Sequence, residues 1–366
     1  MLVEFVEADL DAIKSEIVAA YETKVGRVLQ PAQVETLLLH DLAYREYLVR
    51  QQLNSAANQN LVAAATGSAL EYLAQLVGVT RLAAAAAVCV NRFTLVSGHG
   101  AIVIPAGLRV ASVDGAVTFQ TRVATSVDAL TDVVDIEMIA TTEGVAGNGY
   151  EAGKVATILD PQAYLSTSEN IDTTAGGTET ESDEAMRERI RLAPASFSTA
   201  GSRGAYIFHA KSAHPSIVDV SVDSPTPGLV RVFPLVEGEI ATPTPILTTV
   251  EASVSGEKVR PLTDTVQVLS PTKITYNIDV ELTLFTEAAQ QVAEAAVLAN
   301  LQAFAEFGGA KLGRDRMLNA IRGLCMSVEG VYDVNVVQPA ADVIVAANEF
   351  ASCLGIAVTT TGTNEG

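Results

Sequence analysis

The spacing of apolar residues divides the chain into helical and β-type stretches. In roughly the first 85 residues, apolar positions recur every three or four residues, which places them on one face of a helix. The members of the first apolar stripe are Leu10, Ile13, Ile17 and Ala20. A second helix is predicted after Pro31, and a third over residues 67–77, ending at Gly78. The residues expected to share a face of the second helix are Val34, Leu38, Tyr44 and Leu48. The stripe must be covered either by the protein's own domain or by neighbouring chains, and the pattern leaves both open.

From residue 88 to about 159 the apolar period changes to two. Short β-branched segments are separated there by Gly, Asp or Pro turns, and the Asp114–Gly115 pair is typical of a hairpin. Gly144, Gly147 and Gly149 look superficially like a phosphate loop, but they lack the Lys-Ser/Thr ending that such a loop needs. A glycine-defined turn in a β-sandwich is the better interpretation.

The last 150 residues combine both periods. Residues 217–223 and 229–236 predict a strand pair, and the alternation from Ile274 to Leu284 predicts a strand with one buried and one polar face. The predicted helices cover residues 246–254, 287–304 and 313–326, and the predicted closing strands cover 331–337, 343–346 and 356–360. This order indicates helices on one face of an antiparallel sheet.

Residues 176–215 combine a highly charged helix, a loop and a second helix. Ser182 is a good N-cap, and acidic residues follow it at the positive end of the helix dipole. The arginines further along are Arg187, Arg189 and Arg191. They either pair within the helix, as Glu184 with Arg187, or meet an acidic patch on another subunit. The loop, residues 192–202, is too long for a DNA-binding helix-turn-helix.

These elements predict an α+β multidomain protein. We expect N-terminal helices over residues 1–87, a β-sandwich-like domain over 88–165 and a helix–loop–helix connector over 166–215. A C-terminal α+β region over 216–366 would pack its helices on an antiparallel sheet.

Composition narrows the classes of function. The chain has 366 residues, 49% of them hydrophobic but only 5% aromatic, and a net charge of −20. This charge argues against a nucleic-acid partner, which requires a basic footprint. The longest apolar run, residues 82–90, is too short for a membrane span, and the acidic start predicts no secretion signal. Surplus apolar surface is therefore expected in subunit contacts.

Residues that could support chemistry do not assemble into a recognisable set. His209 and His214 are close in sequence without a Cys, Asp or Glu that would complete a metal site. Cys89, Cys325 and Cys353 are widely spaced, which is typical of reduced thiols. GxSxG, HExxH and CxxC motifs are absent from the sequence. We therefore expect no enzymatic activity, no metal or other cofactor and no small-molecule substrate.

Four sequence patches, in order, resemble the baseplate J-like proteins of contractile-tailed phages. The longest is ESDEAMRERIRLAP followed by FSTAGSRGAYIFHAKSAHPSIVDVSV. The others are LEYLAQLVGVTRL, IPAGLRV with GVAGNGYEAGKV, and GVYDVNVVQPAADVIVAANEF. The resemblance covers roughly residues 60–360, and the first 55 or so residues match none of these patches.

The resemblance implies a structural wedge subunit in the inner ring of a tail baseplate. Such a subunit would contact copies of itself and other wedge proteins, be assembled in the bacterial cytoplasm, and belong to a phage or a bacteriocin-like particle. Its N-terminal helices would join a bundle with partner chains, and its C-terminal domains would dimerise. Two alternatives are a tail adhesin that binds glycans through residues 88–160 and a tail-associated cell-wall hydrolase. The few aromatic residues of that stretch make the adhesin less favoured.

The candidate interface and hinge residues follow from charge and position. The interface candidates are Leu10, Ile13, Ile17, Arg187, Arg189, Arg191, Arg203, Lys311, Arg314 and Arg316. The last three lie at the expected start of a helix, where cations are unfavourable, so either an external partner satisfies them or they are a tolerated local cost. The hinge candidates are Gly176, Gly177, Pro194 and Gly201. A hinged subunit could widen a ring and release the sheath.

Overall fold

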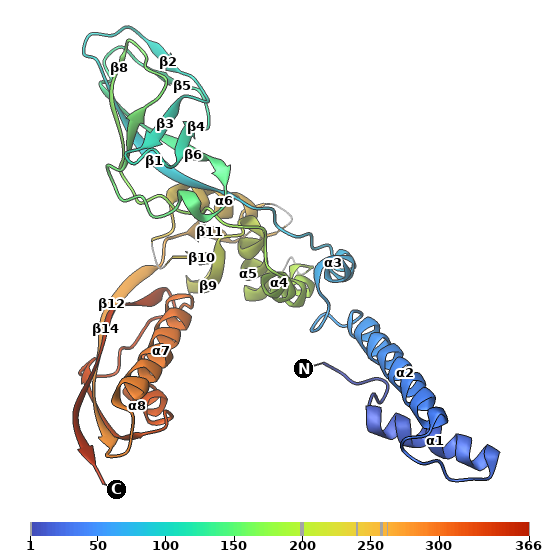
Figure 1. Cartoon of the computed structure of the whole chain (residues 1–366). Helices are drawn as coiled ribbons and strands as arrows, with labels where there is room; N and C mark the ends of the chain where they lie inside the picture. Colours follow the sequence, from blue (N-terminus) through green and yellow to red (C-terminus); the bar gives the residue numbers. More distant parts are fainter. Residues whose placement is uncertain (1, 198–200, 239–240, 257–258, 262, 366) are drawn as a thin grey trace. The chain divides into compact units, whose positions relative to one another are not determined.

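The protein is an α+β multidomain chain, as predicted. The computed structural model describes residues 2–197, 201–238, 241–256, 259–261 and 263–365. The chain divides into two compact units, one made of Met1–Thr80 and Ser182–Arg191, the other of Arg81–Glu181 and Leu192–Gly366. Each unit is described separately below, with element labels as in Figure 1.

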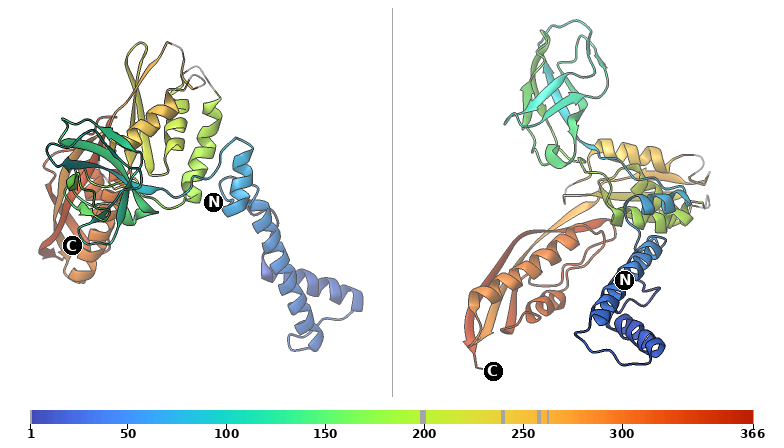
Figure 2. Two further views of the ribbon diagram at one scale, coloured as in Figure 1. Left: turned by 90° about the horizontal axis from the view of Figure 1, so that it is seen from above. Right: turned by 45° about the vertical axis from the view of Figure 1, so that its right-hand side comes forward.

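The first unit is helical. It contains α1 (Leu10–Val25), α2 (Val34–Asn58), α3 (Gly67–Gln75) and the first turns of α4 (Asp183–Ser196). The carboxylate of Asp9 caps α1 by accepting from the backbone of Asp11 and Ala12, and Gly26 closes the helix with φ 71°. α1 and α2 pack side by side (Figure 2). The three helices predicted from apolar spacing are confirmed.

The first domain of the second unit is a nearly closed barrel. A six-stranded sheet runs in the order β7-β3-β4-β6-β1-β8, and β2 pairs with β5. The strand bounds are β1 Ala86–Leu95, β2 Ile102–Ile104, β3 Arg109–Ser112, β4 Thr118–Thr121, β5 Thr125–Val127, β6 Val133–Glu143, β7 Val155–Ile158 and β8 Leu165–Asn170. The Asn170 side chain of β8 accepts from the Val155 amide of β7 at 2.7 Å. β7 and β8 are the two edge strands of the six-stranded sheet, and this bond joins them. The sheet therefore curls on itself where the sequence predicted a β-sandwich.

Both turns predicted in this domain are present. Asp114 and Gly115 join β3 to β4, with Gly115 at φ 73° and the Asp114 carboxylate accepting from the Ala116 amide. After β6, a short 3₁₀ turn (η1, Val145–Gly147) leads to Gly149. A Cβ at Gly147 would lie only 2.8 Å from that of Ala87, so this glycine allows close backbone approach.

A small α+β domain follows. β9 (Ile217–Thr226) pairs antiparallel with β10 (Leu229–Val236), and β11 (Thr265–Val268) adds parallel to β10. Two helices, α5 (Arg203–Ala213) and α6 (Thr244–Val254), share a core with these strands. The second helix of the predicted connector is therefore part of this domain. The first helix, α4, continues through Pro194 to Ser196, into the stretch predicted as loop, and part of that stretch, 198–200, lies outside the described residues.

The C-terminal domain is a three-stranded sheet with two helices. β12 (Thr272–Phe285) lies between β13 (Val331–Gln338) and β14 (Glu349–Asn364), and α7 (Gln290–Gly309) and α8 (Leu318–Met326) share its core. The alternation in β12 is confirmed, since Tyr276, Ile278, Val280, Leu282 and Leu284 are buried.

Several details of this domain differ from the prediction. The helices predicted over 287–304 and 313–326 are Gln290–Gly309 and Leu318–Met326, so Lys311, Arg314 and Arg316 lie before α8 and not at its start. The sheet is mixed, because β12 pairs antiparallel with β13 and parallel with β14. Residues 343–346 form no strand; Val343 makes only an isolated bridge to Arg316. β14 begins at Glu349 and has 16 residues, so the predicted closing strand covered only its middle.

Candidate interaction surfaces

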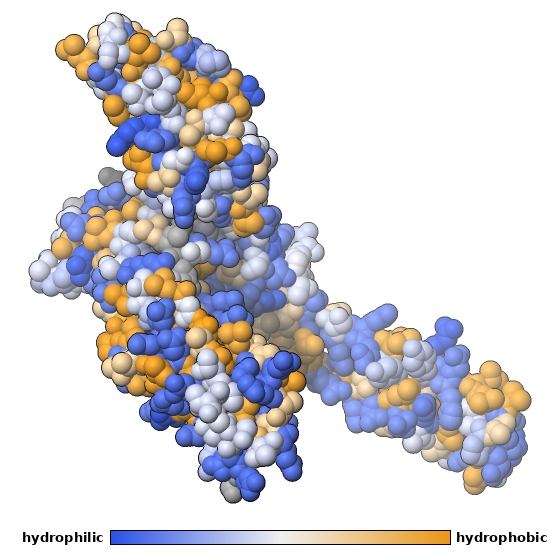
Figure 3. All heavy atoms as spheres, turned by 60° about the vertical axis from the view of Figure 1, so that its left-hand side comes forward, coloured by the Kyte–Doolittle hydropathy of each residue, from blue (hydrophilic) through white to orange (hydrophobic). Residues whose placement is uncertain are grey.

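The outer face of α2 is an apolar surface of the helical unit. Ala43 and Thr36 of α2 are buried, whereas many apolar side chains of the same helix are exposed. These are Val34, Leu37, Leu38, Leu42, Tyr44, Leu48, Val49 and Leu53, with exposed fractions from 41% to 68%. We call this set the α2 outer face. Figure 3 shows apolar side chains on the visible surface of the helical unit and of the C-terminal domain.

The segment before α1 is tied to α2 by two asparagines one turn apart. Asn58 exchanges hydrogen bonds with the backbone of Val3 at 2.9 and 2.7 Å. Asn54 accepts from the amides of Phe5 and Val6 and donates to the Val6 carbonyl. Paired amide side chains of this kind hold an extended segment without a second strand. Phe5 remains 51% exposed and adds to the apolar surface of this unit.

The apolar stripe of α1 packs mainly within the hairpin that α1 and α2 form. Ile13 is 1% exposed, and Leu10 and Ile17 are half-buried. Of the two ways in which the sequence could cover this stripe, packing on the protein's own chain accounts for Ile13. The surface available to another chain is the α2 outer face, of which the sequence pattern indicated Val34, Leu38, Tyr44 and Leu48. Leu37, Leu42, Val49 and Leu53 were missed, although they continue the same helical spacing.

Two arginines of α4 fasten the helical unit internally. Arg187 donates to the carbonyls of Val62 at 3.1 Å and Ala65 at 2.8 Å, and pairs with Glu184 at 2.7 Å. Arg189 is 5% exposed and donates to the Thr80 carbonyl. The two guanidiniums thus satisfy carbonyls in the α2–α3 connection and after α3. The intrahelical Glu184–Arg187 pair considered from the sequence is present.

Ser182 and Asp183, at the start of α4, also accept hydrogen bonds from backbone amides. The Ser182 hydroxyl accepts from the Ala185 amide, which confirms the predicted N-cap. Asp183 accepts from the amide of Gly67, at the start of α3, at 3.1 Å. Among the candidate arginines of the α4–α5 region, Arg191 and Arg203 have exposed side chains. Any contact of this region with a partner would therefore use these two residues.

The C-terminal basic cluster is split between surface and core. Arg314 is exposed and lies 4.5 Å from the ring centroid of Phe307, and Lys311 is half-buried. Arg316 is fully buried, with its guanidinium 5.0 Å from the ring centroid of Phe304. The sequence suggested an external contact for all three cations, but the Arg316 side chain is enclosed in its own domain. A partner can therefore reach Arg314 and Lys311 only.

The hinge candidates sit in different surroundings. Gly177 exchanges hydrogen bonds with the Asn148 side chain at 2.8 and 2.6 Å. Gly176 has φ 86°, and a Cβ there would lie 2.6 Å from the Ile246 side chain. Both glycines are therefore closely packed against neighbouring residues. Gly201 also has positive φ, at 73°. Pro194 lies within α4, where a hinge would require the helix to bend.

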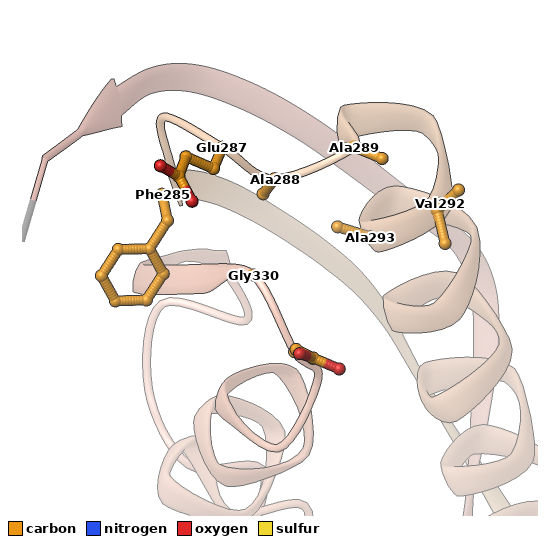
Figure 4. A pocket seen from close by; sticks show the side chains of 8 residues that line it. Phe285, Glu287, Ala288, Ala289, Val292, Ala293 and Gly330 are labelled. Atoms are coloured by element: carbon orange, nitrogen blue, oxygen red, sulfur yellow. The ribbon is translucent and has the colours of Figure 1, made fainter.

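An open hollow lies at the start of α7. Its volume is about 540 Å³, and Figure 4 shows Phe285 and Glu287 on one side of it and Val292 and Ala293 of α7 on another. The remaining lining residues are Ala288, Ala289, Glu329 and Gly330. No histidine, cysteine, serine or lysine is among these lining residues. The hollow is suited to apolar packing more than to bond-making chemistry.

Burial shifts the pKa of two histidines and two of the cysteines. Burial lowers the pKa of His209 and His214 and raises the pKa of the Cys325 thiol to about 11. Burial likewise raises the pKa of Cys89. Across the described residues, no group of three or more His, Cys, Asp or Glu is placed to hold a metal ion. No described helix has both the length and the apolar character needed to cross a bilayer.

Comparison with known proteins identifies the family. Baseplate J-like domains match four consecutive parts of the chain: the N-terminal domain over residues 35–87, the barrel domain over 91–177, the central domain over 198–270 and the C-terminal domain over 276–359. The chain belongs to the baseplate J-like family. The resemblance seen in the sequence is thereby confirmed. The α2 outer face lies almost entirely within the family's N-terminal domain, and β12–β14 lie largely within its C-terminal domain.

A curated relative agrees with this assignment. Baseplate protein J of Escherichia phage P2 is 35% identical over 186 residues, which is 50% of this chain and 61% of that protein. The match thus spans about three fifths of that family member. A chain from the cryo-electron microscopy structure of the anti-feeding prophage baseplate aligns over 96% of this chain and 91% of its own, at 16% identity and a TM-score of 0.36. At that score the likeness supports no structural conclusion.

Proposed function

We propose that this protein is a structural subunit of the baseplate of a contractile tail or tail-like injection particle. In this proposal it is a wedge component of the inner ring, it contacts copies of itself and other wedge proteins, and it performs no catalysis. Ring opening would be transmitted through its linked domains to the sheath. The observation that carries the proposal is the family's four domains in unbroken order along one chain.

The α2 outer face supports an assembly role. A helix that is apolar on the side away from its own hairpin needs another surface to cover it. Helix-in-groove and bundle packing bury such faces through residues three, four and seven apart. We therefore assign the α2 outer face to a helical bundle with partner chains of the wedge.

The charge of the chain supports contact with other proteins of the particle. A net charge of −20 favours partners that present basic surfaces, and it keeps unassembled copies apart in solution. The exposed cations Arg191, Arg203 and Arg314 are the places where an acidic neighbour fits. Charge reversal at these positions tests assembly without touching the internal bonds of Arg187 and Arg189.

The proposal is tested by complementation of a particle-producing strain that lacks this gene. In one variant, Leu38, Leu42 and Val49 of the α2 outer face are replaced by Lys. A control variant places Lys at Val103, Val123 and Leu130, exposed apolar positions outside the helical unit. We expect the first variant to remain folded but to be missing from purified particles, and the control to be incorporated. Normal incorporation of the first variant would reject the bundle.

A further inference from the structure

β14 is the longest described strand and lies at the edge of its sheet. It has 16 residues and pairs with β12 on one side only. Its first residues are covered on the other side, because Phe350 bridges to Leu312 and the Gly313 amide donates to the Glu349 carbonyl. Beyond these residues, no second strand of the described chain pairs with its outer edge. A row of backbone donors and acceptors is therefore directed away from the sheet.

The chemistry of this edge is unusual for a free edge strand. Natural proteins protect edges with charged side chains, proline or short strands. From Phe350 to Asn364, β14 contains no charged residue and no proline. Bulges at Leu354 and Thr361 interrupt its register with β12 and leave a regular stretch from Gly355 to Thr360 between them. This stretch, Gly-Ile-Ala-Val-Thr-Thr, is called the open edge below.

The other edge strands of the molecule carry such protection. β9 has Asp219 and Asp223, and the Asp219 carboxylate accepts from the Leu312 amide. β13 is half as long as β14, contains Asp333 and is followed by Pro339. β7, β8 and β11 have at most six residues. The open edge is thus the part of the described sheets whose composition fits pairing with another strand.

We propose that the open edge pairs antiparallel with the same stretch of a second copy of this chain. The two three-stranded sheets would then form one six-stranded sheet about a two-fold axis, in the order β13-β12-β14-β14-β12-β13. This inference rests on the proposed assembly role, in which C-terminal domains of two copies meet, and it names the surface through which they do so. An isologous contact of this kind needs no partner other than the chain itself.

Charge repulsion between two copies is avoided at this surface. Two chains of net charge −20 repel each other wherever their carboxylates approach. An uncharged strand edge permits close approach, and main-chain hydrogen bonds supply the attraction. Asp279 and Glu281 of β12 lie one strand further in, so the second strand is not placed directly against them.

The pleat fixes the register of the pairing. Ile356 and Val358 pack toward the helices, and Thr360 donates to Glu294 of α7 at 2.6 Å, so alternate residues point to the helix side. In antiparallel pairing about an axis perpendicular to the sheet, residues directly opposite each other share a face. The axis therefore passes through Ala357 or Val358, where each residue lies opposite its own copy. The helices of both copies then cover the same face of the joined sheet.

Disulfide trapping tests this geometry on the full-length protein. Single cysteines are placed at Ile356, Ala357, Val358 and Thr359 in a Cys353→Ser background, where the remaining Cys89 and Cys325 are buried. We expect cross-linked dimer to be greatest at Ala357 or Val358 and to fall on both sides. Equal cross-linking at all four positions, or none, would overturn the proposal.

A charge-swap experiment measures the same contact in solution. Ala357→Lys places equal charges next to each other across the axis, and we expect the dimer to weaken about fivefold or more in sedimentation analysis. Ala357→Glu should behave likewise, and mixing the two variants should restore the dimer. Val337→Lys on the exposed face of β13 is the matched control and should dimerise as wild type does. A wild-type chain that stays monomeric would contradict the proposal.

The two proposals can fail separately. If Ala357→Lys enters particles normally while the α2 outer-face variant does not, the strand pairing is wrong and the baseplate role stands. If the cysteines cross-link as expected but the chain is absent from particles, the pairing stands and the baseplate role is wrong.

Discussion

Gly308 of α7 leaves the space that the guanidinium of Arg316 occupies. A Cβ at position 308 would overlap the Cζ and both terminal nitrogens of Arg316. Arg316 is fully buried, and its cation faces the ring of Phe304 one turn earlier in the same helix. The backbone of Arg316 also exchanges two hydrogen bonds with Val343. This arginine therefore fixes the connection after α7 from inside the domain.

Gly308→Ala should destabilise the C-terminal domain by about 1–3 kcal/mol, because the new methyl group overpacks against the guanidinium. Gly323→Ala in α8 is the matched control, since a Cβ there meets nothing within 4 Å. It should stabilise by up to about 1 kcal/mol through helix propensity. Calorimetry of the transition that includes this domain gives both values. In the double variant Gly308→Ala/Arg316→Leu, the two effects should be strongly non-additive, and simple additivity would refute the contact.

Arg187→Ala should loosen the α2–α3 connection. The variant leaves the carbonyls of Val62 and Ala65 without their charged donor, which costs about 1–3 kcal/mol. Hydrogen exchange should rise selectively in the amides of residues 59–66. Arg191→Ala, four residues further along α4 and exposed, should change stability by no more than about 0.5 kcal/mol. Equal hydrogen exchange over residues 59–66 in the two variants would show that Arg187 does not hold this connection.

Stability should fall as the pH drops below the ordinary range of histidine, in part through His214. Burial lowers the pKa of His214 from 6.5, and its Nδ1 accepts from the Ser216 amide, which a protonated Nδ1 cannot do. The unfolded chain therefore binds the proton first as pH falls through 6.5, and the free energy of unfolding decreases until the folded pKa is reached. His214→Asn keeps an acceptor and should flatten this slope. A pH profile of melting temperature that is identical in wild type and variant would contradict this.

His99 is the internal control for that experiment. The carbonyls of Gly100 and Thr131 raise the pKa of this half-buried ring. Its contribution therefore has the opposite sign: it is present at low pH and is lost as pH rises through the folded pKa. His99→Gln should not flatten the slope below pH 6.5, whereas His214→Asn should.

Local signals in the sequence were sufficient for many elements. The three-to-four spacing in α1 and α2, the Ser182 cap and the alternation in β12 each depend on neighbours within a few residues. The Asp114–Gly115 turn was predictable for the same reason. The family resemblance was also carried by short patches, and the matched domains confirm it.

Long-range pairing decided what the sequence did not show. The Thr- and Gly-rich end of β14 is a strand because it pairs with β12, about 80 residues earlier, and β-propensity alone does not indicate that. Arg316 looked like a surface cation because the space for its guanidinium is left by Gly308 of α7, eight residues earlier, which local signals do not indicate. α4 also extends past Pro194, and in its last turn the Ser196 hydroxyl donates to the Ala193 carbonyl.

The most direct test of the baseplate role is to locate this chain in intact particles. A compact tag at the exposed C-terminal end, imaged by electron microscopy on purified particles, should give density at the baseplate, repeated around the tail axis. Particles assembled with the Leu38/Leu42/Val49 lysine variant should lack that density. Tag density on the sheath or at fibre tips, or intact baseplates without this chain, would contradict the account.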